Sequence, residues 1–157
     1  MGDWIDAEKA ADKEAAGARA VQAQLRLHNA GIIQASLPMF FASFAVIAKE
    51  QAGKLQREYP HDLSKQCGAS GDGNTTVTLQ GCKLPIRVLN LRLNVAGQCI
   101  EIDESTRVSR DRIVPGGFDK VQIKVNDEEE LEAYFRGVRC LAPEDLAQRL
   151  IRYVRGF

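Results

Sequence analysis

The sequence contains few histidines and cysteines, two residue types that form many catalytic and metal sites. It contains two histidines, His28 and His61, and four cysteines that are spread along 157 residues. No two cysteines form a C-x-x-C pair, and no spacing of histidine and cysteine is that of a zinc site. We therefore assign no catalytic residue, no metal ligand and no cofactor. The sequence favours a protein that is not an enzyme, although it excludes no particular reaction.

The chain also lacks a net charge. Twenty-one basic residues balance twenty-one acidic ones, so the formal net charge at neutral pH is zero. A neutral chain generates no long-range attraction toward nucleic acid or an anionic membrane. Aromatic residues make up only 6% of the sequence, and none lies among the arginines where a base could stack. These two observations argue against nucleic acid as a partner.

One short segment does concentrate positive charge. Residues 103–117 are expected to form a polar loop that carries Arg107, Arg110 and Arg112. Guanidinium groups that converge can hold a phosphate or a carboxylate. These three arginines are therefore candidate anion-binding residues, although acidic neighbours such as Glu104 are expected to neutralise part of their charge.

The beginning of the sequence has no basic segment followed by an apolar run, the pattern of a secretory leader. Residues 1–14 are instead acidic and rich in alanine. We therefore expect a cytoplasmic protein with reduced cysteines. The alternative is a disulfide bond between Cys67 and Cys82, which would close a glycine-rich loop.

One stretch is apolar enough to require comparison with a membrane span. Residues 30–48 are nineteen residues without a formal charge, close to the ~20 residues needed to cross a bilayer. The stretch is interrupted by Gly31, Pro38 and several polar residues, which lowers its hydropathy. We expect a buried helix here and keep membrane attachment as an alternative.

The first part of the chain is expected to be helical, because it is rich in alanine and has no proline before Pro38. Its apolar residues recur at spacings of three, four and seven, as on one side of a coiled-coil helix. This seam consists of Ala11, Ala18, Val21, Leu25, His28, Ile32, Ala35 and Met39. Small seam residues permit close helix approach but bury little area, so such a helix is not expected to be stable alone.

A second helical pattern covers residues 36–59, where large apolar residues recur every three or four positions. A face this apolar must pack against the rest of the chain, another copy, a ligand or a membrane. The candidate residues for an interface or an apolar pocket are Leu37, Met39, Phe40, Phe41, Phe44, Ile47 and Leu55.

Two arrangements of residues 3–59 remain open from the sequence. In the first, Gly31 ends one helix and Ser36 begins another, which gives an antiparallel hairpin. In the second, one helix runs through the whole segment with a kink near Pro38. That single helix would be about 80 Å long at ~1.5 Å per residue.

After residue 59 the pattern changes from helix to strand. Residues 60–75 are a glycine-rich linker, and in residues 76–157 apolar and polar residues alternate as in half-buried strands. We expect an antiparallel sheet of four or five strands, with residues 128–136 either strand or helix. A C-terminal helix should pack on the sheet through Leu146, Leu150, Ile151 and Val154.

The sequence thus predicts an α+β protein with a helical segment in residues 1–59, a linker and a sheet domain. The favoured function is a homo-oligomeric interaction or scaffold module, most simply a dimer, that associates through its N-terminal helices. One alternative is a carrier that holds a small apolar molecule between the phenylalanine-rich helix face and the sheet. A second is a peripheral or anchored membrane protein that uses residues 30–48.

Overall fold

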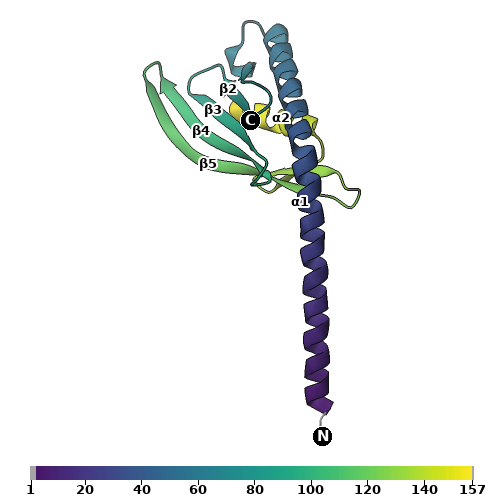
Figure 1. Ribbon diagram of the computed structural model, residues 1–157. Helices are drawn as coiled ribbons and strands as arrows, with labels where there is room; N and C mark the ends of the chain where they lie inside the picture. The colour runs from purple at the N-terminus through teal and green to yellow at the C-terminus, as the bar shows by residue number, and fades with distance from the viewer. Residues whose placement is uncertain (1–2, 157) are drawn as a thin grey trace.

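One long helix runs the length of the molecule, and its second half packs against an antiparallel sheet (Figure 1). The computed structural model describes residues 3–156. The helices are α1 (Asp3–Glu58), a short 3-10 helix η1 (Leu63–Lys65) and α2 (Pro143–Val154). The strands are β1 (Cys67–Ser70), β2 (Thr76–Gly81), β3 (Ile86–Asn94), β4 (Cys99–Ser109), β5 (Arg112–Val125), β6 (Leu131–Phe135) and β7 (Val138–Cys140).

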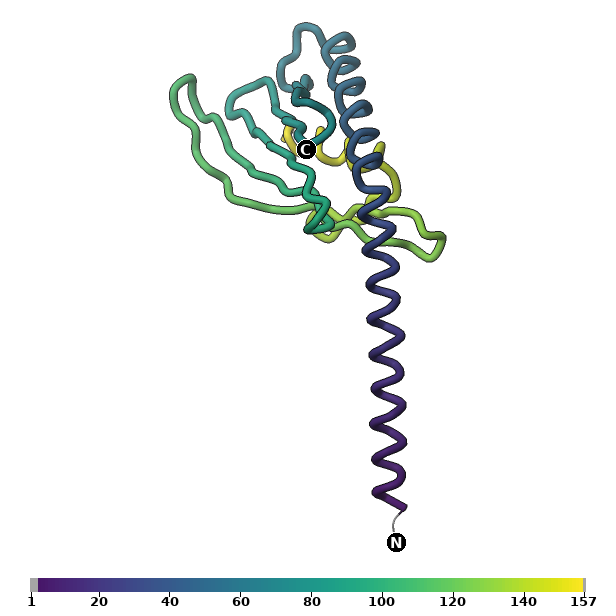
Figure 2. Tube along the Cα trace, viewed as in Figure 1, coloured from purple at the N-terminus to yellow at the C-terminus, as the bar shows by residue number. Residues whose placement is uncertain are grey.

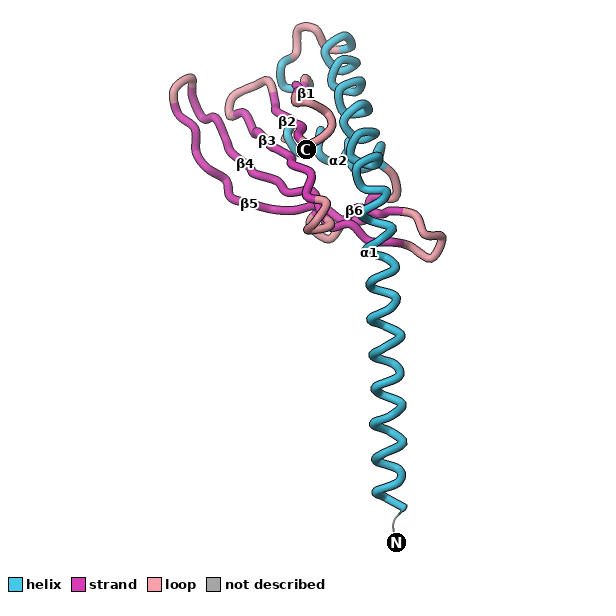
Figure 3. Tube along the Cα trace, in the orientation of Figure 1, coloured by secondary structure: helices cyan, strands magenta, loops and turns pink. Residues whose placement is uncertain are grey.

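The sheet is a simple meander in which every strand pairs with its neighbours in the sequence, in the order β1 to β7. It curls, and α2 and the second half of α1 lie along it (Figures 2 and 3). The inner side chains of the sheet, among them Val77, Leu89 and Ile100, form one buried cluster with residues of both helices. The expected α+β class, with a long N-terminal helix, an antiparallel sheet and a C-terminal helix, is confirmed.

Of the two arrangements left open for residues 3–59, the helical hairpin is wrong, because α1 is a single helix that passes through Gly31, Ser36 and Pro38 without interruption. A glycine in a helix costs only about 1 kcal/mol, and the alanine-rich sequence on both sides of Gly31 favours helix. Pro38 removes one backbone hydrogen bond, to the carbonyl of Gln34. Since Gln34 and Pro38 are both exposed, water can satisfy that carbonyl group.

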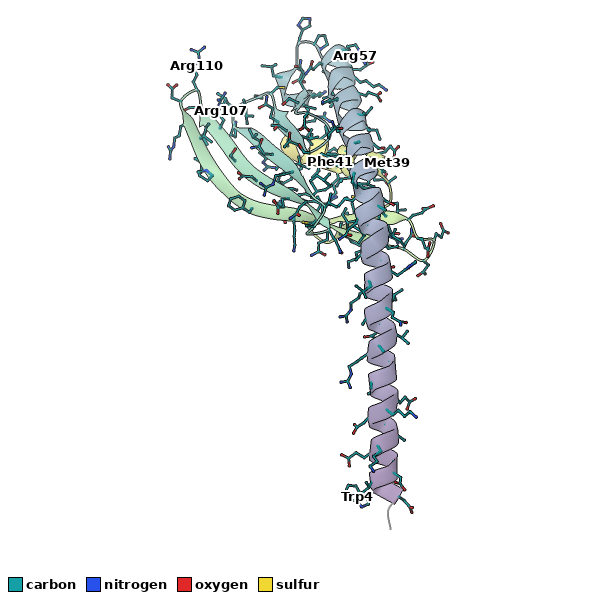
Figure 4. All side chains as sticks on the ribbon, viewed as in Figure 1. Trp4, Met39, Phe41, Arg57, Arg107 and Arg110 are labelled. Carbon is teal, nitrogen blue, oxygen red and sulfur yellow. The ribbon has the colours of Figure 1, made fainter. Side chains whose placement is uncertain are left out.

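The second half of α1 has one face in the core and one face in solvent. Phe41 and Phe44 are fully buried, with their ring centroids 6.0 Å apart. Met39 is 75% exposed. Two residues of separation correspond to about 200° around a helix, so Met39 points away from the sheet that Phe41 contacts (Figure 4).

The C-terminal helix follows its sequence pattern closely. Pro143 is its first residue, and Glu144 and Asp145 occupy its first turn, where acidic side chains interact favourably with the helix dipole. The four residues expected to pack, Leu146, Leu150, Ile151 and Val154, are all buried. This helix contacts α1 as well as the sheet.

The sheet has seven strands, not four or five. The segment expected to be a linker contains strand β1, and β7 adds a short second edge. Residues 103–117 are not a loop, because β4 and β5 continue through most of this segment and turn only between Ser109 and Arg112. Register shifts between Glu104 and Ser105 and near the tip absorb the irregular positions. The segment left open between strand and helix forms β6.

The buried face of α1 gives a direct prediction about stability. Phe44→Ala should lower the free energy of unfolding by about 3–5 kcal/mol, because it leaves a cavity in the core. Ser43→Ala, at the neighbouring exposed position, should change it by no more than about 0.5 kcal/mol. Chemical denaturation monitored by circular dichroism measures both values, and equal effects would show that α1 does not pack on the sheet as described.

Candidate interaction surfaces

The first half of α1 stands clear of the rest of the molecule (Figure 1). Every residue from 3 to 28 is exposed, and we call this segment the arm. Among its exposed side chains are Trp4, Val21 and Leu25, which are 68%, 65% and 56% exposed. Large apolar side chains that recur in solvent along a helix make the arm a candidate interaction surface.

The apolar residues on the free face of α1 follow one continuous pattern of alternating three- and four-residue steps. This set, which we call the outer stripe, consists of Trp4, Ala7, Ala11, Ala18, Val21, Leu25, Ile32, Ala35, Met39, Ala42 and Val46. Only Glu14 and His28 are polar at positions of the same pattern. The stripe extends the seam predicted from the sequence in both directions and spans about six heptads. The three-four spacing was the signal that could have identified Trp4, Ala7 and Val46 as members.

The β5–β6 turn divides the outer stripe into two parts. His28 Nε2 lies 2.9 Å from Glu129 Oε1 in that turn, and Ile32 is half-buried. On the N-terminal side of His28, the stripe residues between positions 4 and 25 are all exposed to solvent. A helix that binds along the arm therefore meets no obstacle before it reaches His28.

The structure separates the residues proposed from sequence for an interface or apolar pocket. Leu37, Phe40, Phe41 and Phe44 are buried in the chain's own core, Ile47 and Leu55 are half-buried, and Met39 is exposed. The phenylalanine rings thus fill space between α1 and the sheet. Contact with a second copy is available to the outer stripe without any rearrangement of that core.

α1 also contains a stretch that is long and apolar enough to cross a membrane. Its most apolar 18-residue window has a mean hydropathy of 1.8, and 33% of that window is buried inside the molecule. A core helix of a soluble protein can pass the same test of length and composition. In the described structure the phenylalanine face of this stretch packs against the chain's own sheet.

The three candidate anion-binding arginines lie at the free end of the β4–β5 hairpin. All three are exposed, and Figure 4 shows Arg110 at the outer end, pointing away from the body. Within residues 3–156 none of the three forms an ion pair. Of the three acidic residues expected to neutralise them, Asp103, Glu104 and Asp111, Glu104 forms its ion pair with Arg136. Anion binding at Arg107, Arg110 and Arg112 stays a prediction.

Glu104 instead belongs to a polar cluster on the inner side of the sheet. Its carboxylate accepts hydrogen bonds from Tyr153 Oη at 2.5 Å and from Arg136 Nη2 at 3.1 Å. Arg136 also donates from Nε to Asp119 at 3.0 Å, and this carboxylate raises the pKa of Arg136 above its ordinary value. Because Arg136 (φ 51°) and Gly137 (φ 78°) form the tight β6–β7 turn, the cluster ties that turn to β4, β5 and α2.

The four cysteines are free thiols in the structure. Cys67 is fully buried in β1, whereas Cys82, just after β2, is half-exposed. Burial raises the pKa of the Cys67 thiol to about 12. The Cys67 side chain is therefore uncharged at neutral pH and serves as a small apolar group in the core.

Residues 3–156 contain no group of three His, Cys, Asp or Glu side chains that could hold a metal ion. No protein-family model, no curated protein and no solved structure matches the chain.

The thiols provide a chemical test of the β1–β2 region. At about pH 8 only the thiolate reacts quickly with iodoacetamide, so Cys82 should be alkylated before Cys67 in the folded protein. Cys67 should react only after unfolding in denaturant, as measured by peptide mass spectrometry. Equal rates at Cys67 and Cys82 in the folded protein would contradict the burial of β1.

Proposed function

We propose that this protein is a homo-oligomeric interaction module that associates through the outer stripe of α1. The observation that supports this most directly is the exposure of Trp4, Val21 and Leu25 on a helical arm that, within residues 3–156, stands clear of the body up to His28. Burial of a large apolar side chain stabilises a complex by about 1.5–3 kcal/mol. A second arm with the same stripe would bury these residues.

The length and isolation of the arm support the same proposal. Its 26 residues form a helix that, within the described residues 3–156, stands clear of the body until His28 meets Glu129. Most helical stability in proteins comes from packing of an apolar face rather than from intrinsic helix propensity. Self-association would supply that packing to the arm.

The arm offers a closely matched pair of positions for testing this proposal. Leu25 lies on the outer stripe, whereas Leu27 lies about 200° around the helix and is 75% exposed. Leu25→Asp should convert the assembly to a monomer of 17.3 kDa, because it places a charge in the contact. Leu27→Asp should leave the assembly intact. Light scattering coupled to size-exclusion chromatography measures both masses.

A wild-type chain that is monomeric at every concentration tested would contradict the proposal. Equal disruption by Leu25→Asp and Leu27→Asp would also count against it, because a loss of helix rather than a loss of contact would then explain both results. Circular dichroism of the two variants should show the same folded sheet domain.

Membrane attachment through residues 30–48 is the second candidate, and the apolar window in α1 is the observation that favours it. Insertion would require Phe41 and Phe44 to leave the core, which is why we rank it below self-association. A carrier function would require a ligand to displace the same two rings. Both alternatives therefore require a loss of core packing, whereas self-association through the outer stripe does not.

Sedimentation with phosphatidylcholine–phosphatidylglycerol vesicles tests the membrane alternative. We expect the wild-type protein to stay in the supernatant. Attachment would instead bring the protein down with the vesicles, and Phe41→Asp would release it while Phe135→Asp would not. Phe135 is the matched control because it is equally buried but lies in β6, outside the apolar window.

A further inference from the structure

We propose that two arms pair antiparallel, so that the N-terminal part of each arm lies against the part of the other arm next to its sheet domain. This inference rests on the proposed self-association and adds its orientation and register. Three features of the arm support it: the distribution of charge, the sizes of the outer-stripe residues and the position of the β5–β6 turn.

The arm carries opposite charge in its two halves. Residues 3–14 contain five acidic residues and two lysines, a net charge of −3, whereas residues 15–28 contain two arginines and no acidic residue, a net charge of +2. A parallel pair would align like charges along its whole length. An antiparallel pair brings each acidic half against a basic half, which steers association and stabilises that orientation.

The single acidic residue in the outer stripe favours the same orientation. In a parallel pair, equivalent seam positions face each other, so Glu14 would meet Glu14 of the second copy inside the contact. In an antiparallel pair a different residue faces Glu14, and the two carboxylates lie apart. Repulsion between the two Glu14 side chains, near the middle of the arm, therefore disfavours a parallel pair.

One antiparallel register places every large residue of the arm opposite a smaller one. In this register Ala7 faces Leu25 of the second copy, Ala11 faces Val21 and Glu14 faces Ala18, while Trp4 lies near His28. Alternation of large and small residues across a seam lets two helices approach closely and fill the space between them. A shift by one heptad toward the bodies would instead place Leu25 opposite the charged Glu14, and a shift by two heptads would place it opposite Val21.

In the same register the paired segment ends at His28, where the body meets the helix. Pairing of residues 4–28 brings the tip of one arm to His28 of the other, where Glu129 of the β5–β6 turn contacts the helix. The bodies then lie at opposite ends of paired arms that are roughly 40 Å long at ~1.5 Å per residue. Such a dimer would hold two sheet domains, each with its β4–β5 hairpin, at a fixed separation.

Engineered cysteines test the register directly. Ala7→Cys and Leu25→Cys are made in separate chains, each with Cys82→Ser to remove the half-exposed natural thiol. Neither variant alone should form a disulfide-linked dimer, because each new thiol faces a residue without one. The two variants mixed under mild oxidation should give a band at twice the chain mass on a non-reducing gel. Ala18→Cys alone is the control for parallel pairing, where Cys would face Cys.

The outcomes separate the two proposals. A cross-link in the mixture but not in Ala18→Cys supports the antiparallel register. A strong cross-link in Ala18→Cys alone, or a dimeric mass by light scattering with no cross-link in the mixture, overturns the register and leaves self-association in place. A monomeric mass for the wild-type chain overturns the self-association on which the register rests.

Discussion

The structure depends on the burial of one face of the second half of α1 against the sheet. Phe41 and Phe44 are fully buried there, and the inner side chains of β2 to β6 and the apolar stripe of α2 pack around them in one core. This contact fixes how α1 is rotated about its own axis. Once Phe41 faces the sheet, Met39 must face away from it, although Ile32 of the outer stripe still packs against the edge of the core. The arm extends the outer stripe beyond the body.

One continuous helix, α1, connects the sheet domain to the arm. Because the helix is continuous from Asp3 to Glu58, a contact made at Trp4 or Leu25 sets the position of the sheet domain without a flexible joint. The cluster of Glu104, Arg136 and Asp119 holds the base of the β4–β5 hairpin from the inner side. A dimer built on the arms would therefore present its two hairpins in a defined geometry, which is what a scaffold or spacer requires.

The sequence predicts well what depends on local periodicity. The α2 stripe and the helical character of residues 3–58 follow from spacing and composition along the chain, whereas the same reasoning leaves the segment that forms β6 open between strand and helix. Prediction from sequence fails where tertiary packing decides between local alternatives. Gly31 and Pro38 resemble helix boundaries. The helix continues through them because the flanking residues are strong helix formers and its second half packs on the sheet. Strands β1 and β7 are too short to show an alternation, and the rotation of α1 that buries Phe41 and exposes Met39 cannot be obtained from spacing alone.

The most direct test of the account is amide hydrogen exchange of the arm as a function of protein concentration. The body should exchange slowly at every concentration, because its helix and strands lie in one core. Amides of residues 3–28 should become more protected as concentration rises, since pairing of the outer stripes would bury one face of the arm. Fast exchange of the arm that does not change with concentration would contradict a self-associating stripe.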